Sequence, residues 1–154
     1  MANKGTMHPL HPANLTRILA GSTLLAWLVT VIADVMWLPL PILPLSASYT
    51  LIALLVLLAG LAVPLYMKYT GARVAPLNPI VSTRTIVLTQ ATMITAVLLG
   101  GWHLGALFFL LPSWASRPVH TPYFSCLAVI ALCTLLLILS WFIQKWSIVK
   151  EDEE

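Results

Sequence analysis

Residues 78–111 read NPIVSTRTIVLTQATMITAVLLGGWHLGALFFLL and contain most of a long uncharged segment of the chain. Arg84 and Arg117 bracket 32 residues that include no Asp, Glu, Lys or Arg. A helix needs only ~20 apolar residues to cross the hydrocarbon of a bilayer. The segment therefore predicts a membrane-spanning helix over about residues 85–111, long enough that it must tilt or protrude.

Small and polar residues recur along this predicted helix at steps of three or four. They are Thr85, Thr89, Thr92, Ala96, Gly100 and His103. Residues at this spacing share one face of a helix. On a membrane helix, small residues let a neighbouring backbone approach, and hydroxyl groups bond across the contact. The stripe predicts that this is a central helix, packed against other helices of a polytopic protein.

Composition places the whole chain among membrane proteins. It has 154 residues, of which 60% are hydrophobic and 8% charged, and its mean hydropathy is +0.94. A soluble domain carries about a quarter charged residues. The net charge of +3 does not indicate nucleic-acid binding, because the cations flank apolar segments and form no basic stripe with interleaved aromatic residues.

Three further apolar segments predict spans, so the expected fold is an all-α integral membrane domain with four transmembrane helices. The spans are expected at about residues 18–36, 49–67, 85–111 and 123–146, between a polar N-terminal tail (1–16) and an acidic C-terminal tail (150–154). The basic start and apolar middle of the first span also fit a cleaved secretory signal. That alternative stays open.

The distribution of Lys and Arg predicts orientation. Seven of the eight lie at the two ends of the chain or between the second and third spans, whereas Arg117 lies between the third and fourth. Positive charge accumulates on the cytoplasmic side of a membrane. We therefore expect two hairpins with both termini in the cytoplasm.

Three glycines in the third span are candidates for helix packing. Gly101 and Gly105 form a Gly-x-x-x-Gly element, next to Gly100. This spacing lets two membrane helices touch, within one chain or between copies. A gap that admits a substrate is the alternative interpretation of the same glycines.

Asp34 and His103 are the ionisable residues expected within the membrane, where such groups are functional candidates by default. If Arg17 and Arg84 mark one level, Asp34 follows by 17 residues and His103 by 19. At 1.5 Å per residue, both then lie about 26–29 Å away, near the outer interface. A contact between them is geometrically allowed, although two separately hydrated groups fit the same positions.

Thr89, Gln90 and Thr92 place hydroxyl and amide groups in the inner half of the third span. Hydrogen bonds between helices account for them, and a polar translocation path is the alternative. The chain has no nucleophile–base–orienter set, metal-ligand spacing or phosphate-binding glycine loop, so we expect no enzyme, cofactor or metal site.

The segment from Asn78 to Gly105 resembles the small four-span actinobacterial membrane proteins of domain-of-unknown-function family 3180. The family pattern is matched by Pro79, Arg84, Leu88, Ala91, Thr92, Gly101-Trp102 and Gly105, and near the carboxyl end by Lys145-Trp146. The proline-rich loop from Pro39 to Pro44 also has its counterpart. Asn78 stands where the family usually has Asp, and Gln90 where it has a basic residue.

The resemblance implies a multi-pass protein of the bacterial cytoplasmic (inner) membrane and implies no reaction. Together with the stripe on the third span, it favours a non-catalytic accessory or interaction subunit. Its expected partners are the lipid bilayer and other membrane proteins, or a second copy bound through the third span. A small transporter or channel subunit, with a polar path joining Thr89, Gln90 and His103, is the alternative function.

Overall fold

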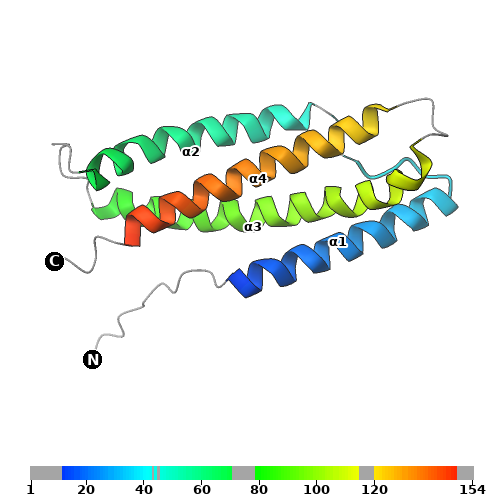
Figure 1. Cartoon of the computed structure of the whole chain (residues 1–154), viewed down its shortest axis with the longest axis horizontal. Helices are drawn as coiled ribbons and strands as arrows, with labels where there is room; N and C mark the ends of the chain where they lie inside the picture. The colour runs from blue at the N-terminus through cyan, green and yellow to red at the C-terminus, as the bar shows by residue number, and fades with distance from the viewer. Residues whose placement is uncertain (1–11, 43, 45, 71–78, 115–119, 149–154) are drawn as a thin grey trace.

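A computed structural model shows an all-α protein, as the sequence predicts (Figure 1). It describes residues 12–42, 44, 46–70, 79–114 and 120–148. The polar residues before Pro12, Asn78 and the acidic tail 150–154 lie outside the described residues. The described part contains α1 (Pro12–Val35), α2 (Ala47–Tyr69), α3 (Pro79–Leu110), the 3-10 turn η1 (Leu111–Ser113) and α4 (Thr121–Ile148).

Proline marks the first turn of three of these helices. Pro12 begins α1, Pro79 begins α3, and Pro122 is the second residue of α4. Proline is tolerated there because the first turn needs no backbone N–H donor, and its fixed φ suits the helix. Both α1 and α3 begin six residues before the expected spans, since hydropathy detects only the apolar part of a helix.

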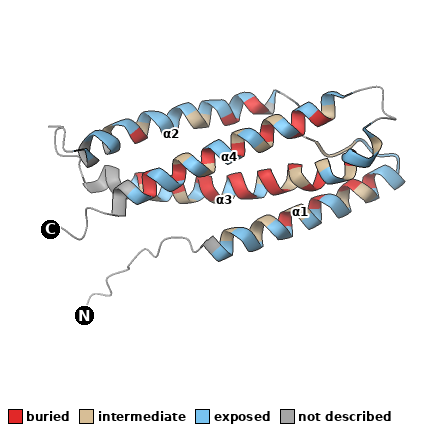
Figure 2. Cartoon of the chain, in the orientation of Figure 1, coloured by how far each residue is buried: buried red, intermediate tan, exposed pale blue. Residues whose placement is uncertain are grey.

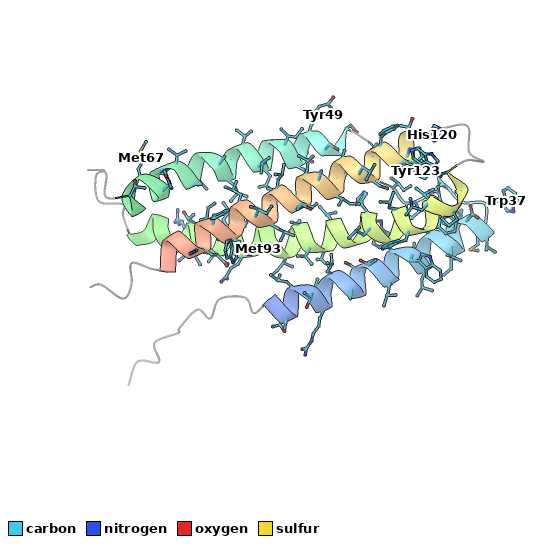
Figure 3. The ribbon with its side chains drawn as sticks, in the orientation of Figure 1. Trp37, Tyr49, Met67, Met93, His120 and Tyr123 are labelled. Atoms are coloured by element: carbon cyan, nitrogen blue, oxygen red, sulfur yellow. The ribbon has the colours of Figure 1, made fainter. Side chains whose placement is uncertain are left out.

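The C-terminal end of α1 is closed by a backbone motif. The N–H of Leu38 donates to the carbonyl oxygen of Ala33 (2.8 Å), and the N–H of Trp37 donates to that of Asp34 (3.2 Å). Trp37 has a φ of 56°, as the residue after a helix has in a Schellman motif, where glycine is usual. Its side chain is 95% exposed and stands away from the helices in Figure 3.

The helices lie in a row in the order α1, α3, α4, α2 (Figure 1). In chain order, successive helices run in opposite directions, so the start of α1 and the end of α4 lie towards the same end of the bundle (Figure 1). However, the expected hairpin of the first two helices is not a packed pair. Within the described residues, α1 packs extensively against α3 alone and α2 against α4 alone.

The central position of α3 is evident from burial (Figure 2). In the most apolar window of α3, 44% of residues are buried, against 22% in that of α1. Among the described residues, three helices are long and apolar enough to cross a membrane: residues Ala13–Val35, Arg84–Ser113 and Thr121–Lys145. The apolar part of α2 that the structure describes, Ser48–Pro64, is shorter than these three.

The proline-rich loop after α1 packs over one end of α3 and α4. Leu40 and Ile42 contact the cluster formed by Ala106, Leu110, Tyr123 and Cys126. The indole N–H of Trp102 donates to the carbonyl oxygen of Pro41 (2.9 Å). The loop therefore links α1 to the central pair of helices, although α2 follows it in the chain.

Candidate functional site

The contact between α1 and α3 is made at two glycines. A Cβ atom added to Gly101 would overlap Ser22 Oγ and lie 3.0 Å from the carbonyl oxygen of Leu19. A Cβ added to Gly105 would overlap the carbonyl oxygen of Thr23. Because neither position carries a side chain, the backbones of the two helices approach directly, as at Gly-x-x-x-Gly contacts in membranes.

Gly100 faces α4 rather than α1. A Cβ added there would lie 3.4 Å from the Cβ of Cys133, an ordinary van der Waals distance. Successive residues of a helix point about 100° apart, so the adjacent Gly101 is turned towards the other neighbour. The three glycines thus belong to two different helix contacts within one chain.

These contacts fix the register of α1 along α3. Gly101 lies beside Leu19 and Ser22, and Gly105 beside Thr23, so the two helices run parallel. Arg17 is therefore level with about Val97. That is roughly 13 residues, or about 20 Å, beyond Arg84. The condition that Arg17 and Arg84 mark one level is therefore not met in this register, because basic residues flanking two spans do not fix how the helices slide along each other.

The small and polar stripe of α3 is buried along its whole length. Thr85, Thr89, Thr92, Ala96, Gly100 and His103 are all buried. The sequence predicts that the hydroxyls of Thr89 and Thr92 bond to another helix. Instead, they donate to carbonyl oxygens of their own helix, those of Thr85 (3.0 Å) and Leu88 (2.8 Å) respectively. These hydroxyls are satisfied without a partner helix, so the stripe contributes close packing. Gln90 lies outside the stripe and is partly exposed.

His103 is fully buried and does not pair with Asp34. Its Nδ1 lies 2.8 Å from the carbonyl oxygen of Leu99, so Nδ1 carries the hydrogen, since a carbonyl only accepts. Its Nε2 is buried and has no hydrogen-bond partner among the residues that the structure describes. Asp34 is exposed, and the register of α1 places it about 16 Å farther along the bundle than His103.

Near the start of α1 lies an apolar groove of about 530 Å³. Its lining residues come from three helices: Leu15, Thr16 and Leu19 of α1, Met93 and Val97 of α3, and Leu137, Ile138, Trp141 and Phe142 of α4. In Figure 3, Met93 is labelled where the C-terminal half of α4 overlaps α3. Sequence reasoning missed this groove, because it depends on the register of α1 along α3.

The described residues offer no evident metal ligands. No group of three or more His, Cys, Asp or Glu side chains placed to hold an ion occurs among them. Cys126 and Cys133 are buried free thiols, consistent with packing in an apolar contact.

Comparison with known proteins identifies a family. A family model described as "Protein of unknown function (DUF3180)" matches residues 15–151, which confirms the resemblance drawn from the motifs of α3. Neither a curated protein nor a solved structure matches the chain.

Proposed function

The chain belongs to this family of proteins of unknown function (DUF3180), and we propose that it is a non-catalytic interaction subunit embedded in the bacterial cytoplasmic membrane. The three long apolar helices support the membrane location. We include α2 as a fourth span, because its 23 residues extend for about 34 Å against a hydrocarbon thickness of about 30 Å.

We propose that both termini are cytoplasmic. The start of α1 and the end of α4 lie towards the same end of the bundle (Figure 1). In the sequence, seven of the eight Lys and Arg residues occur at the two ends of the chain or between the second and third spans, which supports this orientation. Reporters fused after residue 45 or 118 should then read outside, and those after 75 or 152 inside. A reporter after residue 75 that reads outside contradicts the orientation.

The observation that carries the interaction role is a difference between two groups of glycines. Gly100, Gly101 and Gly105 each face a neighbouring helix, whereas a Cβ added at Gly21 on α1 or Gly60 on α2 would meet nothing within 4 Å. Glycine inside a helix costs about 0.5–1 kcal/mol relative to alanine. No contact with another described residue explains that cost at these two exposed positions. A helix of another membrane protein that packs closely against α1 or α2 would explain why glycine is present there.

Leucine at these two positions tests the role. We expect Gly21→Leu or Gly60→Leu to reduce co-purification of a partner from native membranes, with abundance and thermal stability unchanged. Ala20→Leu and Ala59→Leu are matched controls, because these neighbours are also exposed but point in another direction. The same co-purifying proteins at the same yield in all four variants would contradict the proposal.

Four buried polar atoms have no hydrogen-bond partner in the described part of the chain, and three of them favour the second candidate function, a transporter or channel subunit. They are His103 Nε2 on α3, and Ser140 Oγ and Gln144 Nε2 on α4, all buried. The antiparallel register set by Gly100 and Cys133 places Gln144 level with Thr89. Cysteines introduced at positions 89, 96 and 103 distinguish the two functions. A water-soluble thiol reagent should leave all three unlabelled in an interaction subunit and label them in a channel.

A further inference from the structure

The apolar groove arises because α1 begins part of the way along α3. The register set by Gly101 and Gly105 places Pro12, the first residue of α1, level with about Thr92. The first turns of α1 therefore form one wall of the groove, and the C-terminal half of α4 forms the opposite wall. Its volume of about 530 Å³ lies within the range of about 300–1,000 Å³ usual for small-molecule sites.

One end of the groove continues into polar side chains. Gln90 precedes Met93 by three residues and lies on the same face of α3. Lys145 follows Trp141 by four residues on α4, and its Nζ lies 5.7 Å from the centroid of the Trp141 ring. Lys145 is exposed and Gln90 is partly exposed. The cation and the amide therefore lie about one turn beyond the apolar lining.

The depth of this polar end matches a lipid headgroup. Gly100 faces Cys133, and the Tyr123 hydroxyl donates to the carbonyl oxygen of Leu110, so α3 and α4 are in antiparallel register. Lys145 is then level with about Leu88, roughly 6 Å inward from Arg84. The groove follows directly on the membrane side of Lys145.

We propose that the groove binds an acyl chain of an anionic phospholipid of the cytoplasmic leaflet, with the headgroup phosphate held by Lys145 and Gln90. An acyl chain matches the apolar lining, and an ammonium group and an amide N–H donate to phosphate oxygens. Basic pockets between membrane helices on the cytoplasmic side bind anionic headgroups in this way. The proposal rests on the membrane location proposed above and does not depend on a protein partner.

Two pairs of variants test the site in the full-length protein. Ile138→Trp fills the groove from an exposed lining position, and Leu135→Trp places the same side chain at an equally exposed position outside the lining. Lys145→Gln removes the cation at the polar end. Arg17→Gln is its control, because Arg17 is exposed next to Thr16 but points away from the groove by helical geometry.

The readout is binding of dioleoyl phosphatidylglycerol and dioleoyl phosphatidylcholine to the detergent-purified protein, followed by native mass spectrometry. We expect the wild type to prefer phosphatidylglycerol by about fivefold, the discrimination that one basic residue near an anionic lipid surface provides. Lys145→Gln should abolish this preference, and Arg17→Gln should retain it. Ile138→Trp should weaken binding of both lipids, and Leu135→Trp should not.

Equal binding of both lipids by the wild type would overturn the proposal. So would equal effects of Lys145→Gln and Arg17→Gln, or capture of a protein rather than a lipid by a photo-crosslinker at position 138. Alkaline extraction of the cell membranes from which the protein is purified tests the membrane location separately. Co-purification with the Gly21→Leu variant reports the protein partner, so each failure is distinguishable.

Discussion

Gly105 on α3 lies so close to the carbonyl oxygen of Thr23 on α1 that only glycine fits at this position. A Cβ atom there would overlap that oxygen and lie 2.9 Å from both the Cβ of Ala26 and the backbone nitrogen of Trp27. All three neighbouring atoms belong to α1, and two of them are backbone atoms. Backbone atoms cannot move aside by a side-chain rotation. The position of α1 in the bundle therefore depends on the absence of a side chain at Gly105.

A glycine at position 37 should stabilise the protein. Trp37 has a φ of 56°, and a non-glycine residue in this left-handed region costs of order 1–3 kcal/mol. Its side chain is almost fully exposed, so little packing is lost. We expect Trp37→Gly to raise the free energy of unfolding in detergent by about 1 kcal/mol and Trp37→Ala not to raise it. Equal effects of the two substitutions would show that the backbone conformation is unimportant.

Asp34 and His103 should behave as independent sites. The structure separates them by about 16 Å along the bundle, and neither ring nitrogen of His103 is hydrogen-bonded to Asp34. In a double-mutant cycle of Asp34→Asn and His103→Gln, we expect the losses of unfolding free energy to add within about 0.3–0.5 kcal/mol. A coupling energy clearly larger than this would restore the paired interpretation.

Arg17 and Arg84 should lie at different depths. The glycine contacts place Arg17 level with about Val97 on α3. Nitroxide labels at positions 17 and 84 should therefore differ in depth by about 20 Å. Position 17 is the deeper one. Collision rates with oxygen and with a polar nickel complex measure this directly in reconstituted bilayers. Equal depths for the two labels would show that the register of α1 along α3 is different.

Local patterns in the sequence anticipated much of this fold. The spacing from Thr85 to His103 identified the buried face of α3, because side chains three and four residues apart share a face whatever they contact. The helix class and the family followed from hydropathy and from the motifs around Gly101 and Gly105.

Relations between helices did not follow from the sequence. Three features depend on which helices meet and on how far each is shifted along its neighbour. They are the row that separates α1 from α2, the different neighbours of Gly100 and Gly101, and the groove lined by Met93 and Trp141. Charged residues at span ends are long enough to reach the interface from several depths, so Arg17 did not report its own level.

The stability of two alanine variants at adjacent positions tests the central claim, that α3 holds α1 through a glycine contact and α4 through a looser one. Gly101→Ala places a Cβ against Ser22 and the carbonyl oxygen of Leu19, whereas the Cβ of Gly100→Ala meets only Cys133, at 3.4 Å. Thermal unfolding of the two purified proteins in the same detergent is the measurement. We predict that Gly101→Ala loses about 1–3 kcal/mol, the usual cost of overpacking, and that Gly100→Ala is unchanged or gains, since alanine is the better helix former. Equal stability of the two variants, or a larger loss at Gly100, would contradict the account.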